Sequence, residues 1–329
     1  MHEITFRALQ NLPYEFFDLI FTGIIMDESS DHYLSASFGK KLYRRIYTPR
    51  NSSREELRGG VLMVHGLGDH MGRHEKAASM FCDQGLIAAG LDWPGHGHSP
   101  GKRGHSDGVE PLLDLITESL ADLRERLPTG SPIGLYAHSI GAFVLLQFLS
   151  EQALMKADVI NHPSSFSFVW LSSPMLYPVH RQGVVKINIS KWLSKIAPTF
   201  CLDTGSRPSR CYPPNSDTGL FKEDPLGHHN ISLALAADIL KRNRSVDDGA
   251  HVFQQPMRLL ITQGGDDTIC PPDYSQIFFD AVSLPTEDKT YLLLPGVLHE
   301  PLSGPEAFEL LTTVAVWVDE TLNARPKVE

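Results

Sequence analysis

Ile133-Gly-Leu-Tyr-Ala-His-Ser-Ile-Gly-Ala142 is the most informative stretch of this chain. Its first four residues lean apolar and predict a buried strand, and residues 142–149 are apolar enough to predict a buried helix. Between them, Ala137, Ser139 and Gly141 form a small-x-Ser-x-Gly pattern, with alanine where glycine is more usual. A serine between strand and helix is typical of a nucleophile elbow, whose tight turn lifts the hydroxyl above the sheet. A helix-capping serine is the alternative interpretation.

A glycine motif upstream supports the elbow. Val61-Leu-Met-Val64 predicts a buried strand, and His65-Gly-Leu-Gly68 follows it directly. Acyl transfer places negative charge on the substrate's carbonyl oxygen, which two prearranged backbone N–H groups stabilise. In the elbow architecture one donor follows the nucleophile and the other lies on the loop after an earlier strand, which predicts Ile140 and Leu67. A plain glycine turn is the alternative for this motif taken alone.

Composition and charge exclude several classes of protein. The chain has 329 residues, of which 42% are hydrophobic and 21% charged, as in an ordinary globular protein. A net charge of −10 argues against general nucleic-acid binding. Four cysteines do not make a disulfide framework, and we expect free thiols, although Cys201 and Cys211 are close enough in sequence to pair.

The first residues give no targeting signal. They lack the basic segment of a signal peptide. Residues 16–26 are apolar, but this run of 11 residues contains Asp18 and is too short to span a bilayer. We therefore expect a cytoplasmic protein.

Predicted strands and helices alternate from residue 61 onward. We expect strands at 61–65, 86–91, 133–136, 166–171, 257–262 and 290–294, and helices near 72–84, 110–127, 142–149, 273–283 and 304–322. This alternation predicts an α/β fold with a mostly parallel sheet covered by helices on both faces. Residues 41–47 alternate partly and are expected to add an antiparallel edge strand.

The alternation breaks between about residues 174 and 235. This stretch is rich in proline, shows no buried strand and is too long for a plain loop in a compact domain. Ligands of open α/β sheets bind at the carboxyl ends of the strands. We therefore expect residues 174–235 to form an inserted cap there, over a core made of residues 1–173 and 236–329.

A serine nucleophile needs a base, which is normally a histidine oriented by a carboxylate. In the chain order of this architecture, the acid and then the histidine follow the serine. The loop after strand 257–262 offers Asp266 and Asp267, and the residues themselves leave this choice open. The loop after strand 290–294 offers His299 alone, which we predict to be the base.

This chemistry needs no cofactor, and we predict none. His96-Gly-His98 could hold part of a metal site, but no third ligand follows at a suitable spacing. We therefore expect no metal either.

Five motifs together suggest a family, and they lie at residues 65–73, 92–104, 138–141, 222–226 and 263–270. They resemble the monoacylglycerol lipase/lysophospholipase branch of the α/β-hydrolases over roughly residues 35–320. The resemblance implies a serine carboxylester hydrolase that cleaves lipid-like esters with one acyl chain through an acyl-enzyme on Ser139. It places the acid on Asp267. It also implies that Asp69 and Arg73 help to form a polar head-group pocket, although the family usually has glutamate at position 69.

Related activities share the same catalytic residues. A short-chain esterase, thioesterase or acyltransferase would carry the same Ser139, Asp267 and His299. A non-catalytic binding protein on the same fold is a third class, and the complete set of three residues argues against it. An epoxide hydrolase or dehalogenase would need aspartate at position 139.

One segment of the predicted cap suggests contact with a membrane. Over residues 185–196, apolar side chains recur at helical spacing and lysines occupy the rest of the surface. The apolar residues are Val185, Ile189, Trp192, Leu193 and Ile196, and the lysines are Lys186, Lys191 and Lys195. This helix either roofs the acyl pocket or also rests on anionic lipid, as basic amphipathic helices do.

Overall fold

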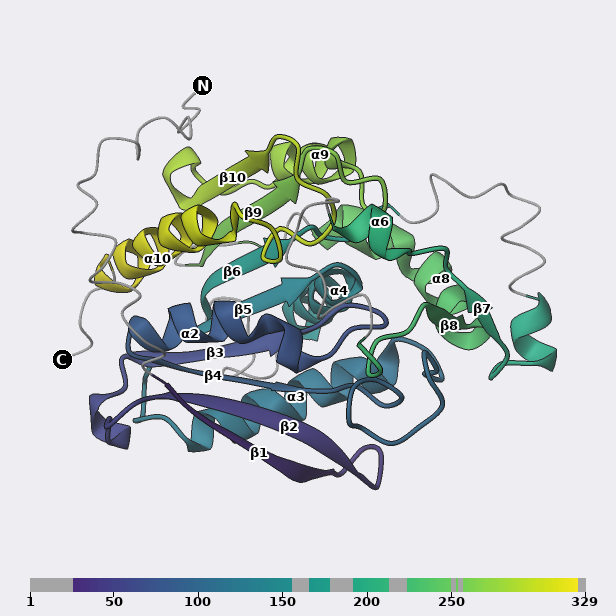
Figure 1. Ribbon diagram of the computed structural model, residues 1–329, viewed down its shortest axis with the longest axis horizontal. Helices are drawn as coiled ribbons and strands as arrows, with labels where there is room; N and C mark the ends of the chain where they lie inside the picture. The colour runs from purple at the N-terminus through teal and green to yellow at the C-terminus, as the bar shows by residue number, and fades with distance from the viewer. Residues whose placement is uncertain are drawn as a thin grey trace.

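An eight-stranded sheet forms the centre of the molecule (Figure 1), in the strand order β1-β2-β4-β3-β5-β6-β9-β10. The computed structural model describes residues 26–155, 166–177, 192–212, 224–249, 253 and 257–324. The strands are β1 (Met26–Ser35), β2 (Lys40–Pro49), β3 (Gly59–Val64), β4 (Leu86–Leu91), β5 (Ile133–His138), β6 (Phe166–Ser172), β9 (Arg258–Gly264) and β10 (Lys289–Leu294).

The sheet is parallel from β4 to β10 and antiparallel at the β1–β2 end. β2 was expected at the edge, but it lies one strand inside, because β1 pairs along its whole length. β1 is exposed at most of its positions. It is held on β2 by the backbone ladder and by ion pairs of Asp31 with Arg44 and of Glu28 with Arg45, and not by an apolar face. Because its sequence is polar and lacks an alternating apolar pattern, the sequence analysis did not predict this strand.

Helices cover both faces of the sheet, which confirms the predicted fold class. One face packs on α2 (Glu75–Asp83) and α10 (Ala307–Asn323), and the other on α3 (Glu110–Glu125), α4 (Ile140–Met155), α8 (Leu233–Gly249) and α9 (Pro272–Ala281). Successive residues of β6 point into opposite cores: Val169 contributes to one and Trp170 to the other. Such burial on two faces explains why the central strands are apolar without alternation.

β6 and β9 are neighbours in the sheet although a long stretch of chain separates them. They pair in parallel, with Phe168 opposite Arg258 and Ser172 opposite Thr262. The stretch between them contains the predicted cap and α8.

Residues 192–212 and 224–232, which we call the cap segments, lie apart from the main sheet at the right of Figure 1. They contain the short antiparallel strands β7 (Cys201–Asp203) and β8 (Asn230–Ser232) and the short helix α6 (Pro208–Cys211). The sequence showed no strand here because both are only three residues long and mostly not buried. The predicted helix 185–196 is helical at residues 192–196, and its earlier residues lie outside the described part of the chain.

Candidate active site

Ser139 lies at the sharp turn between β5 and α4, as expected for an elbow. Its φ of +53° is a strained backbone conformation for a residue other than glycine. Gly141 is required on the far side of this turn, because a Cβ there would lie 2.4 Å from the carbonyl oxygen of His65. The Ser139 N–H donates to Ser172 O at 3.0 Å, which ties the turn to the neighbouring strand.

His299 connects Ser139 with an aspartate. Its Nε2 lies 2.9 Å from Ser139 Oγ, and its Nδ1 lies 2.7 Å from Asp267 Oδ2. All three residues come from loops at the carboxyl ends of parallel strands: β5, β9 and β10. A hydroxyl bonded to an imidazole that a carboxylate orients is the arrangement of an activated serine nucleophile.

The structure brings Asp267, and not Asp266, against His299. Asp267 is buried, and its Oδ1 accepts the N–H groups of Ile269 at 2.8 Å and Cys270 at 2.9 Å. Gln263 Nε2 donates to Oδ2 at 3.1 Å, so the carboxylate is held from several sides. The side chain of Asp266 is exposed.

Leu67 and Ile140 flank the space above Ser139, and both line the same cavity. Within the described part of the chain, neither backbone N–H has a hydrogen-bond partner. Two unoccupied donors beside a nucleophile have the character of an oxyanion hole.

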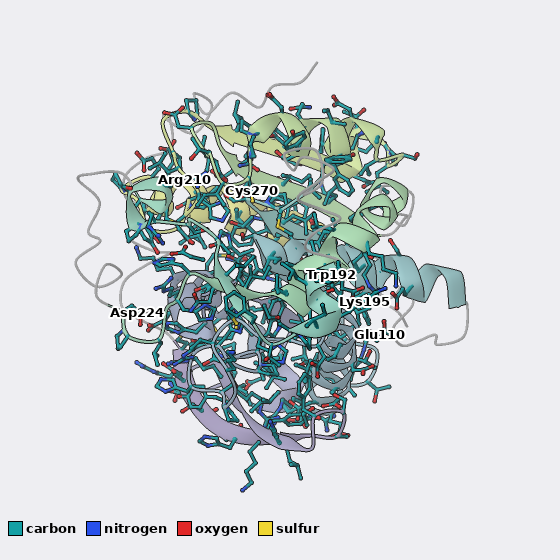
Figure 2. The ribbon with its side chains drawn as sticks, turned by 90° about the vertical axis from the view of Figure 1, so that its right-hand side faces the viewer. Glu110, Trp192, Lys195, Arg210, Asp224 and Cys270 are labelled. Carbon is teal, nitrogen blue, oxygen red and sulfur yellow. The ribbon has the colours of Figure 1, made fainter. Side chains whose placement is uncertain are left out.

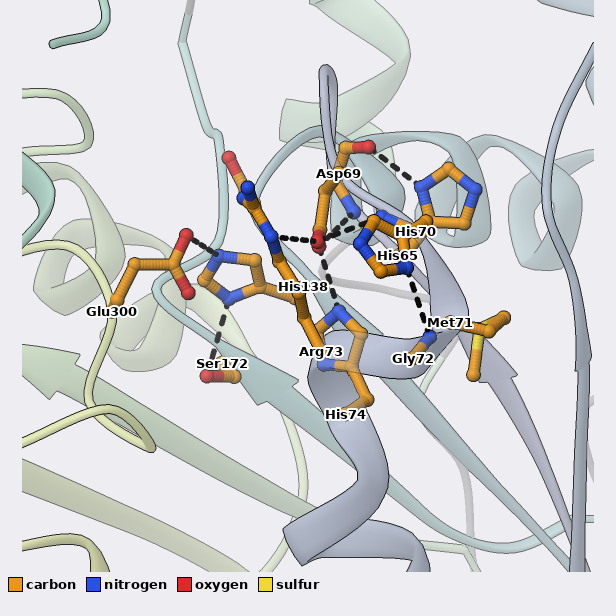
Figure 3. A network of polar contacts seen from close by, with 12 residues as sticks. His65, Asp69, His70, Met71, Gly72, Arg73, His74, His138, Ser172 and Glu300 are labelled. Carbon is orange, nitrogen blue, oxygen red and sulfur yellow. Dashed lines mark hydrogen bonds and ion pairs between the residues drawn. The ribbon is translucent and has the colours of Figure 1, made fainter. Parts of the chain in front are cut away.

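Asp69 forms hydrogen bonds with the loop that carries Leu67. Its Oδ2 accepts the Gly66 N–H at 3.2 Å and lies 2.7 Å from His74 Nε2, and its Oδ1 accepts the His70 N–H at 2.8 Å (Figure 3). Burial opposes ionisation of this carboxyl, but His74 and Arg73 outweigh it and hold the pKa of Asp69 well below its usual value. Asp69 lines the cavity, but both its oxygens are engaged by the protein itself.

Arg73 also lines the cavity, and it pairs with a residue of the cap segments that sequence reasoning did not single out. Its Nε donates to Asp224 Oδ2 at 2.9 Å, and the same oxygen lies 2.8 Å from His70 Nε2. Asp224 lies within the 222–226 motif that contributed to the family resemblance. Its pairing spans about 150 residues of chain, so no local pattern could have revealed it.

A second imidazole–carboxylate pair, with a buried histidine and a partly buried glutamate, lies beside the first, and sequence reasoning also missed it. His138 Nε2 lies 3.3 Å from Glu300 Oε1, and its Nδ1 lies 3.4 Å from Ser172 Oγ (Figure 3). Burial alone would raise the pKa of Glu300, but His138 lowers it to about 2; in turn Glu300 overcomes burial and raises the pKa of His138. The only local signal was adjacency, since His138 precedes Ser139 and Glu300 follows His299.

A cavity of about 450 Å³ opens above Ser139, within the range of small-molecule sites. Arg73, Asp224, Glu300 and His138 make its wall partly polar, and many of the other lining residues are apolar, among them Met175, Leu176, Ile231, Ile239, Leu240, Ile269 and Tyr274. His228 and His229 line it as well. The cavity can therefore hold a ligand that carries both polar and apolar groups.

Potential metal ligands in the described residues gather only around the same imidazole. The two groups of three that lie close enough together are His138, His299 and Glu300, and Asp267, Cys270 and His299. His299 is already hydrogen-bonded to Ser139 and Asp267. His96 and His98 belong to neither group. All four cysteines, Cys201 and Cys211 included, are free thiols.

Comparison with known proteins assigns the chain to a family. The family model described as serine aminopeptidase, S33, matches residues 55–306. The chain belongs to this family. A monoacylglycerol lipase of Mycolicibacterium smegmatis is 26% identical to this S33 hydrolase over 300 residues, which cover 90% of this chain and 99% of that one. A solved structure, the monoacylglycerol lipase of Paleococcus ferrophilus, has 28% identity and a TM-score of 0.71, and it covers 85% of this chain and 99% of its own.

A third relative is an uncharacterized abhydrolase domain-containing protein of Dictyostelium discoideum. It is 32% identical over 262 residues, which make up 80% of this chain but 26% of the Dictyostelium protein. Together, the family model and the lipase relatives show that this chain is an α/β-hydrolase similar to monoacylglycerol lipases, and that it is a hydrolase enzyme. Among its described residues, no helix has both the length and the hydropathy to cross a bilayer.

Proposed function

We propose that this hydrolase cleaves lipid-like carboxylic esters with one acyl chain through an acyl-enzyme on Ser139. The observation that carries the proposal is the hydrogen-bonded series Ser139–His299–Asp267, whose Ser139 and His299 line a cavity with both polar and apolar side chains. Relatives named as monoacylglycerol lipases support the substrate class.

The proposed reaction uses each group in turn. His299 Nε2 takes the proton of Ser139 Oγ, which attacks the ester carbonyl carbon, while the N–H groups of Leu67 and Ile140 stabilise the oxyanion. His299 then gives the proton to the leaving alcohol. A water molecule, activated by His299, attacks the acyl-enzyme and releases the fatty acid. Asp267 stabilises the imidazolium throughout.

The charges around the polar wall favour a neutral head group. Arg73 is paired with Asp224 and lies 3.8 Å from Asp69, and His138 is paired with Glu300. A phosphate or an ammonium group would have to displace one of these partners, whereas glycerol hydroxyls need only hydrogen bonds. We therefore place monoacylglycerol before lysophospholipid, and either before an aminoacyl substrate.

We also propose that residues 174–235 act as a cap on a core of residues 1–173 and 236–329, and that the cap rests on lipid. Trp192 and Ile196 are each 62% exposed, and neither lines the cavity, which argues against a mere roof. Phe200 is 56% exposed and Leu202 43% exposed. Trp192 and Lys195 lie together on one side of Figure 2, away from Asp224. Leu202 also lines the cavity, so the apolar surface leads toward Ser139.

The decisive experiment compares substrates on purified protein. We expect hydrolysis of monoacylglycerol to exceed that of lysophosphatidylcholine with the same acyl chain, and aminoacyl p-nitroanilides to be inert. Ser139→Ala should lower kcat by roughly 10⁴-fold or more and abolish labelling by a fluorophosphonate. Labelling that persists in Ser139→Ala would reject the nucleophile, and faster turnover of a thioester or of acyl transfer to an added alcohol would reassign the reaction.

A further inference from the structure

The loop that carries Leu67 is held from its outer side by residues 224–228 of the cap segments. The Asp224 carboxylate accepts from His70 and Arg73 of the core and, through Oδ1, from the Leu226 N–H at 2.9 Å. This local bond fixes the carboxylate on its own turn. Figure 3 shows His70 and Arg73 on the two sides of Asp69. Asp69 binds the same loop through the N–H groups of Gly66 and His70.

A second contact reaches the loop itself. The His228 N–H donates to Gly68 O at 3.0 Å, directly beside Leu67. The two chains approach so closely that a Cβ on Gly68 would lie 1.8 Å from His228 O. Gly227 likewise packs on the guanidinium of Arg73, since a Cβ at this position would lie 2.5 Å from Nη2.

Residues 66–70 are thus hydrogen-bonded by two carboxylates, those of Asp69 and Asp224. Asp69 binds Gly66 and His70 from the inside, and the turn that begins at Asp224 binds Gly68 and His70 from the outside. The peptide N–H of Leu67 lies between these anchors. Its direction depends on both, because a glycine on each side leaves the loop backbone little stiffness of its own.

We propose that Asp224 is a positioning residue that aims the Leu67 N–H at the substrate oxyanion, so that seating of the cap segments completes the oxyanion hole. This inference rests on the proposed function. If so, the position of residues 224–228 affects how well the enzyme stabilises the transition state. Any contact that moves the cap segments would then change the rate.

The test replaces Asp224→Asn, which keeps size but removes the charge that attracts Arg73 and His70. Losing an oxyanion donor costs about 10²–10³-fold in kcat, and a misdirected donor should cost less, about 10- to 100-fold. We expect this loss in kcat, with KM nearly unchanged, for both a monoacylglycerol and p-nitrophenyl butyrate. A loss confined to monoacylglycerol would overturn the proposal, because Asp224 would then serve only the head group.

A transition-state probe separates positioning from general stability. An alkyl trifluoromethyl ketone forms a hemiketal: Ser139 Oγ bonds to the carbonyl carbon, the carbonyl π bond breaks, and the serine proton moves to His299. Its oxyanion then occupies the proposed hole. Asp224→Asn should weaken binding of this ketone by about the factor lost in kcat/KM, and binding of the matching secondary alcohol by less than twofold. Equal weakening of both ligands would overturn the proposal.

Asp238→Asn is the matched control. Asp238 Oδ2 accepts the Val109 N–H at 2.9 Å and the Arg242 Nε at 3.0 Å, so it too joins one backbone N–H and one guanidinium. It lies on α8 and does not line the cavity. We expect its substitution to lower Tm without changing kcat.

Failure of the wild type to hydrolyse any ester would instead reject the proposed function.

Discussion

At the scale of single residues, the two carboxylates of one loop should behave very differently. Asp267 touches His299, whereas Asp266 is exposed one residue away. We expect Asp267→Asn to lower kcat by about 10⁴-fold, because the amide favours the wrong imidazole tautomer. Asp266→Asn should stay within twofold of the wild type. Steady-state kinetics on p-nitrophenyl butyrate checks both, and similar losses would place the acid elsewhere.

The His138–Glu300 pair predicts a window of pH in which it stabilises the fold. The pKa of Glu300 is lowered to about 2, so its contribution is present above the unfolded pKa and is lost as the pH falls toward 2. The pKa of His138 is raised, so its contribution is complete below the unfolded pKa and is lost as the pH rises through the folded one. With unfolded pKa values of about 4.3 and 6.5, the window is roughly pH 4.5 to 6.5.

Glu300→Gln should remove this contribution. The difference in unfolding free energy between the wild type and the variant should be largest inside that window and shrink on both sides. Urea titrations at a series of pH values measure it, with the exposed Glu287→Gln as control. A difference that does not change with pH would mean that the pair is not ionised in the folded protein.

At the scale of elements, the predicted helix 185–196, of which the structure describes residues 192–196, should direct the protein to lipid. Each lysine near an anionic surface contributes about 1 kcal/mol at most, so three can shift binding by up to roughly a hundredfold. We expect Lys186, Lys191 and Lys195 changed to Glu to weaken co-sedimentation with anionic vesicles, and Trp192→Ala to weaken it further. Hydrolysis of a soluble short-chain ester should barely change.

The charge control for this experiment is Lys40→Glu with Lys41→Glu, at the far end of the sheet on β2, where both side chains are exposed. It should leave vesicle binding nearly intact. If wild type fails to co-sediment at low salt, or if the control loses as much binding as the cap variant, the helix makes no specific contact with lipid.

At the scale of the whole molecule, the sheet separates two apolar cores, one on each face, and hydrogen bonds between side chains of neighbouring strands lie inside them. Trp170, fully buried on the side of α2 and α10, donates its indole N–H to Thr262 Oγ1 at 2.9 Å. Thr262→Val should leave that N–H unpaired and cost about 1–3 kcal/mol of unfolding free energy. Urea denaturation checks this, with kcat as the control. If Trp170→Phe makes Thr262→Val no less costly, the hydrogen bond is not the cause.

Most strands of the parallel sheet could be predicted from apolar runs, because strands buried on both faces must be apolar throughout. Their order in the sheet could not be predicted, because apolar runs do not say which strands are neighbours. β1 could not be predicted in this way, because an edge strand held by backbone hydrogen bonds and ion pairs needs no apolar face. Ser139 and His299 could be predicted from the order of loops along the chain, whereas the choice of Asp267 over Asp266 came from the family resemblance. Asp224 and Glu300 did not, because each meets its partner across more than 150 residues and acts through charge, which leaves no periodic trace.

The pairing of β6 with β9 has a consequence for the newborn chain. Synthesis proceeds from the N-terminus and domains fold as units. Ser139 therefore leaves the ribosome long before the strands that carry its acid and its base. The sheet can form fully only after the whole intervening stretch has emerged. Until then, Ser139 has neither its base nor its acid and cannot act as a nucleophile. Hydrolysis can begin only after the residues that carry Asp267 and His299 have emerged and paired with Ser139.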